Sequence, residues 1–132
     1  MQLKRCNPMN KNSQNVAVLG ASAKTERYSN KAIKMLLEYG HEVIPVHPAL
    51  QFIEGLPVAG DLDQIKNRVD TLTVYVSSKV SSSLKEKIIR LTPGRVIFNP
   101  GAENQELKKR LEEDEIKCEE ACTLVLLRTG QF

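Results

Sequence analysis

The sequence predicts an α/β fold in which a mainly parallel, doubly wound sheet of about five strands carries helices on both faces. The chain has 132 residues, a length typical of a single domain. Hydrophobic residues make up 41% of it and charged residues 27%, the balance of an ordinary globular protein. Short apolar runs alternate with segments of helical periodicity, a pattern that indicates right-handed strand–helix–strand crossovers.

The domain is expected to begin after a polar segment. Residues 1–14 are rich in Asn, Lys and Ser and show no periodicity, so they predict a flexible tail before a domain of residues 15–132. The apolar run 16–19 ends at Gly20, as expected of a strand buried on both faces. The sheet is therefore expected to start at this strand.

A polar loop leads from the first strand to a predicted helix over residues 29–39. Ser29 is its candidate N-cap, and Gly40 is the candidate residue that follows its last turn. Residues 42–46 predict a second short strand, which Pro48 ends. These elements form the first crossover.

The stretch after the second strand is less regular. Gly55 and Pro57 punctuate it, and the segments 52–53 and 56–59 are expected to be extended. Residues 61–66 fit a short helical turn. This stretch is therefore expected to be an irregular connection before the next strand.

The second half of the chain repeats the alternation. Residues 72–76 are apolar and β-branched and predict a strand. Ser81 is the candidate cap of the following helix, which Pro93-Gly94 ends. Residues 95–98 predict the fourth strand of the sheet.

The end of the chain predicts a helix, a strand and a second helix. The charged segment 104–115 is expected to be helical, with Glu106 and Arg110 spaced for an ion pair that contributes about 0.2–0.5 kcal/mol. Residues 116–119 predict the last strand, and the apolar segment 122–127 favours a helix over a strand. The whole order of elements is that of a single Rossmann-like domain.

Composition argues against several function classes. The formal net charge is +3, aromatic residues are 5% and Trp is absent, so no nucleic-acid partner is expected. The longest apolar stretch, 124–127, is far too short for a membrane span, and no apolar signal segment follows Met1. Three cysteines argue against a disulfide framework and favour a reducing, cytoplasmic setting.

The loop after the first strand predicts a phosphate-binding site. Ligands of doubly wound folds bind where the strands end, near the point where strand order reverses. Gly20 allows close backbone approach, Ser22 offers a hydroxyl, and Lys24 and Arg27 offer cations beside a helix N-terminus. Ser22 and Thr25 replace the later glycines of the dinucleotide fingerprint. The alternative is that Gly20 only ends a strand and Ser22 caps a local turn.

The end of the second strand bears on the identity of the ligand. An NAD-binding domain usually places Asp or Glu here to bind the adenosine ribose. This chain has Pro45, Val46, His47 and Pro48, without a carboxylate. A ligand whose ribose is phosphorylated at the 3′ position, such as coenzyme A, does not require that acid. His47 either contacts the ribose or its phosphate, or is satisfied within its own loop.

Several segments, spread in order over roughly residues 15–130, form a recognisable pattern: Val18-Leu19-Gly20-Ala21-Ser22, Arg27-Tyr28-Ser29, Val43-Ile44-Pro45-Val46-His47-Pro48, Gly55, residues 69–76, Val96-Ile97-Phe98-Asn99-Pro100-Gly101 and residues 120–125. Together they resemble the small stand-alone CoA-binding domain family, which is related to the nucleotide-binding domain of the succinyl-CoA synthetase α subunit. Where many relatives have Asn, Lys and a Trp-x-Gln-x-Gly segment, this chain has His47, Ala49 and residues 98–101. The resemblance implies a Rossmann-like fold that binds coenzyme A or an acyl-CoA.

The resemblance also implies which residues bind the ligand. Residues of the first loop would line the phosphate site, namely Gly20, Ala21 and Ser22, with Arg27 and Tyr28 beside them. Residues after the second strand would flank the adenosine, namely Pro45, Val46, His47 and Pro48. Residues after the strand 72–76 would form the opposite wall, namely Val76, Ser77 and Ser78.

No constellation of residues predicts catalysis or metal binding. Cys118 and Cys122 have no nearby histidines in sequence, so a metal site is not expected. Cys122 matches a family cysteine and is either a small buried residue or a reactive thiol. A non-catalytic binding module is favoured. The alternatives are a small nucleotide-dependent transferase or reductase using Cys122 or His47, and a regulatory subunit that uses bound coenzyme A as a signal to a protein partner or a second copy.

Overall fold

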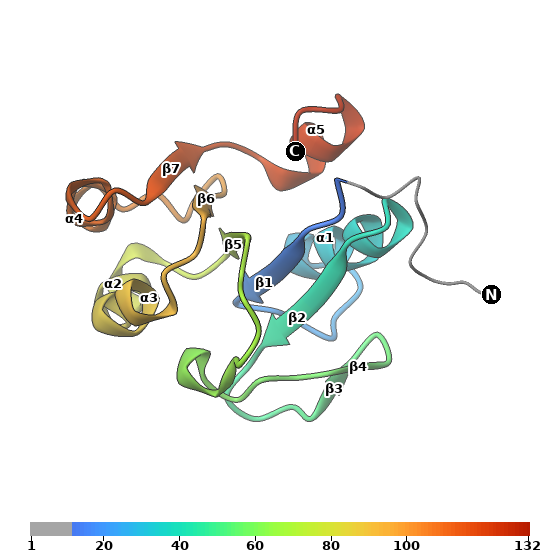
Figure 1. Ribbon diagram of the computed structural model, residues 1–132. Helices are drawn as coiled ribbons and strands as arrows, with labels where there is room; N and C mark the ends of the chain where they lie inside the picture. The colour runs from blue at the N-terminus through green and yellow to red at the C-terminus, as the bar shows by residue number, and fades with distance from the viewer. Residues whose placement is uncertain (1–11) are drawn as a thin grey trace.

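A computed structural model describes residues 12–132 and shows a five-stranded parallel sheet (Figure 1). The strand order is β2-β1-β5-β6-β7, and every neighbouring pair is parallel. The strands are β1 (Asn15–Leu19), β2 (Glu42–Val46), β5 (Thr71–Val74), β6 (Arg95–Phe98) and β7 (Lys117–Glu120). This confirms the predicted α/β, Rossmann-like fold. Of the expected tail, residues 1–11 lie outside the described residues.

Helices cover both faces of the sheet because the strands are apolar on both faces. The helices are α1 (Tyr28–Glu38), α2 (Ser78–Ser83), α3 (Lys85–Leu91), α4 (Gln105–Glu113) and α5 (Thr123–Arg128). In β1, Val16 and Val18 pack in a cluster with residues of α1 and α5, whereas Ala17 and Leu19 pack with residues of α3 and α4. Figure 1 shows α1 and α5 on one side of the sheet and α2 and α3 on the other. The sheet is therefore doubly wound.

A small hairpin and a 3₁₀ turn connect β2 to β5. The hairpin consists of β3 (Phe52–Ile53) and β4 (Leu56–Pro57), and its turn residues Glu54 and Gly55 have φ values of 51° and 77°. The 3₁₀ helix η2 covers Leu62–Gln64. The expected extended segments and the short helical turn are thus present. No helix of the described residues combines the length and apolarity needed to cross a membrane.

Two predicted helix starts are wrong by a few residues. Helix α1 begins at Tyr28 with Arg27 in the cap position, not Ser29, which lies buried inside the helix. Ser77 caps α2 through its hydroxyl, which accepts the Val80 N–H at 3.3 Å, and Ser81 lies inside that helix. Both serines are buried by packing that a local pattern does not contain, and the helix begins before each of them.

Two further local predictions need correction. Strand β5 covers Thr71–Val74, earlier than the predicted 72–76, because the chain leaves the sheet at Tyr75. The expected partner of Arg110 was Glu106, but the guanidinium instead pairs with Asp114 at 3.4 Å and Glu86 at 4.0 Å. A partner on a neighbouring helix is not visible in the sequence.

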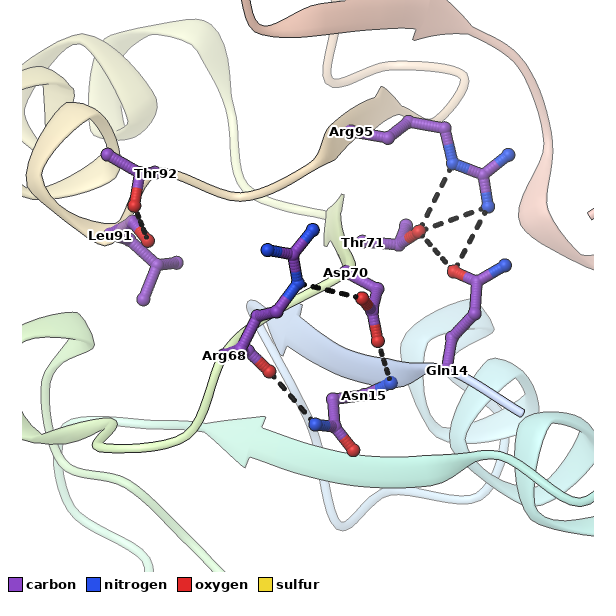
Figure 2. Close-up of polar contacts among 8 residues, drawn as sticks. All are labelled: Gln14, Asn15, Arg68, Asp70, Thr71, Leu91, Thr92 and Arg95. Carbon is purple, nitrogen blue, oxygen red and sulfur yellow. Dashed lines mark hydrogen bonds and ion pairs between the residues drawn. The ribbon is translucent and has the colours of Figure 1, made fainter. Parts of the chain in front are cut away.

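Polar contacts tie together the edge of the sheet where the strands begin (Figure 2). The Asp70 carboxylate accepts the Asn15 N–H at 2.7 Å and pairs with Arg68 at 3.2 Å. The Arg95 guanidinium donates to the Thr71 hydroxyl at 3.0 and 3.1 Å and pairs with Glu119 at 3.2 Å. Because these charged groups already have partners, this edge is less suited to a ligand than the opposite one.

Acidification should destabilise the protein through His41. Its Nδ1 accepts the Gln14 N–H at 3.1 Å, and burial, followed by the charge of Arg95, lowers its pKa below the ordinary 6.5. The unfolded chain then binds more protons near this pH, so the stabilisation is complete above pH 6.5 and is lost as the pH falls through the lowered pKa. Denaturant unfolding from roughly pH 8 to pH 5 should show this slope. His41→Gln should flatten this slope, and an unchanged slope in that variant would refute the assignment.

Candidate functional site

Strand order places the candidate site at the carboxyl edge of β1 and β5. The chain moves from β1 outward to β2, and then returns to the other side of β1 as β5, so the order reverses between β1 and β5. Leu19 is in register with both Val46 and Val74. The residues that follow these three strands, including Gly20 and His47, therefore leave the sheet at one level. This is the position at which doubly wound folds bind ligands.

Gly20 lets two of these chain segments approach closely. Its φ is +89°, and a Cβ on it would lie 2.9 Å from Val76 Cγ1 and 3.1 Å from the Tyr75 carbonyl carbon. A side chain here would therefore meet both backbone strain and a steric clash. Gly20 does end the strand, and it also brings the β1 loop against the chain that leaves β5.

The β1 loop is held to its surroundings by hydrogen bonds. The Ala21 N–H donates to the Val46 carbonyl at 3.3 Å, and the Ser22 hydroxyl accepts the Lys24 N–H at 3.1 Å. The Ser22 carbonyl accepts the Asn30 side-chain amide at 2.8 Å. The expected local role of Ser22 is thus present, and the loop is fixed relative to both β2 and α1.

Asn30 is a site neighbour that the sequence did not indicate. It is fully buried, and its Nδ2 also donates to the Glu54 carboxylate at 3.0 Å. Its Oδ1 has no hydrogen-bond partner among the described residues. A buried amide oxygen without a donor is costly, so the region behind the loop has unused hydrogen-bonding capacity.

The N-terminus of α1 presents positive charge beside the loop. The Lys31 N–H makes the first intrahelical bond, to the Arg27 carbonyl at 3.1 Å, so the amides before it lie at the positive end of the helix. Arg27 is exposed, and Tyr28 is 68% exposed. The Lys31 ammonium lies 5.3 Å from the centre of the Tyr28 ring. An anion at this helix end would meet amides and two cations.

The last two residues of β2 are buried, and the histidine that follows them is bonded within its own turn. Pro45 and Val46 are buried, whereas Pro48 is exposed. The half-buried His47 accepts the backbone N–H groups of Ala49 and Leu50 on Nδ1, each at 3.0 Å. The local role weighed for His47 is therefore present on one nitrogen. In the neutral ring the proton then sits on Nε2.

The residues predicted for the opposite wall lie where the chain leaves β5. Val76 is half-buried and adjoins Gly20, and Ser77 and Ser78 are exposed at the start of α2. The Ser77 hydroxyl is occupied as the helix cap. The structure thus places all three groups of predicted residues at the same edge of the sheet.

A mainly apolar cavity of about 270 Å³ opens beside this loop. Its lining residues come from the exits of β5 and β6 and the starts of α1 and α5; they are Tyr28, Tyr75, Asn99, Pro100, Cys122 and Leu124. Tyr28 is the only one of them among the predicted binding residues. Burial raises the pKa of Tyr75 to about 12, so its hydroxyl stays protonated, and its oxygen has no partner among the described residues.

A buried polar network supports one wall of this cavity. The Asn99 amide nitrogen donates to the Thr73 hydroxyl at 2.7 Å and to the Val74 carbonyl at 3.0 Å. Its oxygen accepts the Thr123 N–H at 2.9 Å, and the hydroxyls of Thr73 and Thr123 lie 2.8 Å apart. Asn99 therefore joins β5, β6 and the start of α5, and so fixes the position of Cys122.

Two larger hollows lie elsewhere on the molecule. One, of about 330 Å³, lies between η2 and α3, and the other, of about 440 Å³, lies at the amino edge of the sheet. In each of them one lining arginine is already paired: Arg90 with Asp63 at 2.9 Å and Arg95 with Glu119 at 3.2 Å. The carboxyl edge combines an open helix end with an apolar cavity and remains the better candidate.

This architecture is that of the doubly wound α/β domains in which a glycine loop and a helix N-terminus meet at the switch point. Residues 14–128 match the model of a family described as a CoA binding domain, and the chain belongs to that family.

The chain is also similar to solved structures and to a curated protein. A crystal structure of an uncharacterized protein is 38% identical, covers 91% of this chain and 98% of its own, and has a TM-score of 0.81. The structure of cell-free ID.343 from Thermus thermophilus is 27% identical over 92% of each chain, with a TM-score of 0.84. Uncharacterized protein YneT of Bacillus subtilis (strain 168) is 26% identical over 76% of this chain and 75% of its own.

Proposed function

We propose that this chain is a non-catalytic module that binds coenzyme A or an acyl-CoA at the carboxyl edge of β1 and β5. The observation that carries the proposal is the Gly20 loop, which abuts the N-terminus of α1 at the switch point of a CoA-binding-family domain. Backbone amides, the helix dipole and exposed cations favour a diphosphate there. The free thiols of Cys118 and Cys122 are consistent with a reducing, cytoplasmic setting.

The rest of the ligand would extend along the neighbouring strand exits. In the proposed pose, Gly20, Ala21 and Ser22 line the diphosphate, and Pro45, Val46, His47 and Pro48 flank the adenosine. The exposed residues after β5, including Ser77 and Ser78, form the opposite wall. The His47 Nε2–H is the group best suited to donate to a 3′-phosphate, because Nδ1 is already an acceptor.

Ligand selectivity tests this proposal. Because β2 ends without a carboxylate, we expect affinity to fall in the order coenzyme A, dephospho-coenzyme A, NAD. Loss of one solvated phosphate contact weakens binding by about 1–2 kcal/mol, or roughly five- to thirtyfold, and less at high salt. Melting curves and competition titrations with the three ligands measure this order, and the melting temperature should rise most with coenzyme A. Equal affinity for NAD would show that the missing carboxylate carries no specificity.

Arg27→Ala should weaken coenzyme A binding by roughly tenfold or more, because a hydrogen bond to a charged group contributes about 1.5–3 kcal/mol. Fold stability should change little, since the Arg27 side chain is exposed and makes no cap bond. Lys34→Ala, which removes an exposed cation further along the same helix, is the matched control. Calorimetric affinities that are the same for both variants would remove Arg27 from the site.

A further inference from the structure

The cavity beside the β1 loop is the feature that the proposed phosphate site leaves unassigned. Tyr28 belongs to both, because it opens α1 and also lines the cavity. From Tyr28 the lining continues across the sheet to Tyr75 after β5 and to Asn99 after β6. The cavity therefore adjoins the proposed diphosphate position at Tyr28 and lies on the side away from β2.

We propose that this cavity holds the sulfur end of the ligand, and that its preferred occupant is a coenzyme A thioester with a short apolar acyl group. This inference rests on the proposed function and adds the class of ligand that the site prefers. It assigns a role to Tyr75, Pro100, Cys122 and Leu124, which the diphosphate and adenosine positions do not use.

The direction of the ligand follows from its own connectivity and from strand order. In coenzyme A the diphosphate lies between the adenosine and the pantetheine arm. With the diphosphate at the β1 loop, one half must run toward β2 and the other toward β5 and β6. The polar turn around His47 lies on the β2 side and suits a phosphorylated ribose. The pantetheine arm and its sulfur then run toward the cavity.

The lining of the cavity fits an acyl group better than a charged one. None of its six lining residues carries a formal charge, and two aromatic rings, Pro100 and Leu124 supply most of its wall. A ribose or phosphate placed here would lose hydration with few partners. The volume of about 270 Å³ exceeds the roughly 150 Å³ that accommodates a benzene ring in an apolar protein cavity. A sulfur atom with a short acyl chain therefore fits.

A fragment comparison tests which half of the ligand occupies the cavity. Titrations of 3′,5′-ADP, coenzyme A and butyryl-CoA are compared for the unaltered protein, Cys122→Phe and Cys118→Phe. Cys122 lines the cavity, whereas Cys118 is equally half-buried but belongs to the packing of the opposite face. Filling the cavity should weaken butyryl-CoA by roughly tenfold or more and leave 3′,5′-ADP within about twofold. Cys118→Phe should change neither the affinity for butyryl-CoA nor the affinity for 3′,5′-ADP.

Three other outcomes would contradict either this inference or the proposed function. An equal loss of 3′,5′-ADP affinity in Cys122→Phe would place the adenosine half in the cavity and overturn the inference. Unchanged affinity for all three ligands in Cys122→Phe would do the same. Failure of the unaltered protein to bind any of them would instead overturn the proposed function itself.

Disulfide exchange tests the same assignment without filling the cavity. The protein for this experiment carries Cys6→Ser, so that Cys6 cannot react. The Cys122 thiolate attacks one sulfur of coenzyme A disulfide, forms a mixed disulfide and releases one coenzyme A thiol, so no other oxidant is needed. Peptide mass spectrometry should show Cys122 modified at least about tenfold faster than Cys118, whose thiol pKa is raised to about 11 by burial. Excess 3′,5′-ADP should slow the reaction at Cys122 only. Equal rates, or no slowing, would overturn the inference.

Discussion

Replacing Gly20 with alanine should destabilise the fold by about 2–5 kcal/mol and reduce coenzyme A affinity by more than tenfold. The left-handed backbone at φ +89° costs an alanine about 1–2 kcal/mol. Crowding against Val76 and the Tyr75 backbone adds about 1–3 kcal/mol. Relief of that contact would push the β1 loop away from the β5 exit, where the diphosphate is proposed to bind. Denaturant unfolding and calorimetric titration measure the two effects.

Gly55→Ala is the matched control for Gly20→Ala. Gly55 also has a left-handed φ of +77°, but a Cβ on it would meet nothing within 4 Å. The free energy of unfolding of this variant should therefore fall only by the backbone contribution of about 1–2 kcal/mol, and its ligand affinity should not change. If the two variants lose the same stability and the same affinity, the close approach of Gly20 to β5 has no energetic importance.

The strands that could be predicted most accurately are those with sharp sequence boundaries. The predictions for residues 42–46 and 95–98 coincide with β2 and β6. Gly40 precedes β2, has φ +87° and is followed by the bond from His41 to the Leu36 carbonyl, which is typical of a Schellman cap. Turn residues of this kind set the ends of an apolar run in the sequence, so the predicted strand boundaries agree with the structure.

Predictions failed where tertiary contacts choose among similar residues. Five serines lie between residues 77 and 83, and each could cap a helix. Ser81 is buried because its hydroxyl accepts the Asn104 side-chain amide at 2.8 Å and donates to the Ser78 carbonyl at 3.2 Å. Asn104 belongs to a later helix start, so the local pattern could not show this choice.

Only the part of the candidate site whose residues follow one another in the sequence could be predicted. The Gly20 loop follows from the order strand, glycine, polar loop and helix, which is local. The cavity needs the exits of two strands and the start of α5 to converge, and its residues are scattered through the chain. Tyr75 was expected inside a strand, and Asn99 lay in a segment of family resemblance without an assigned role. Two signals for this region were available in the sequence: the departure from the family pattern at residues 98–101, and the family cysteine Cys122.

Asn99→Ala should destabilise the protein by about 2–4 kcal/mol and weaken acyl-CoA binding more than binding of 3′,5′-ADP. Removing the side chain deletes three hydrogen bonds and strands the Thr123 N–H inside the protein. A stranded buried donor costs about 1–3 kcal/mol, in addition to the lost bonds. Because Asn99 orients the start of α5, the positions of Cys122 and Leu124 should loosen with it. Unfolding curves and titrations with butyryl-CoA and 3′,5′-ADP measure both effects.

Leu111→Ala is the control for Asn99→Ala. It shows whether a loss of fold stability alone changes ligand binding, without a change in the wall of the cavity. Leu111 is fully buried in α4, in the apolar cluster on the opposite face of the sheet from α5, and its truncation costs about 2–5 kcal/mol. A comparable loss of stability should then occur without a change in the ratio of butyryl-CoA to 3′,5′-ADP affinity. If Leu111→Ala changes that ratio as much as Asn99→Ala does, the effect reflects general loosening. If only Asn99→Ala changes it, the network around Asn99 positions the wall that contacts the acyl end of the ligand.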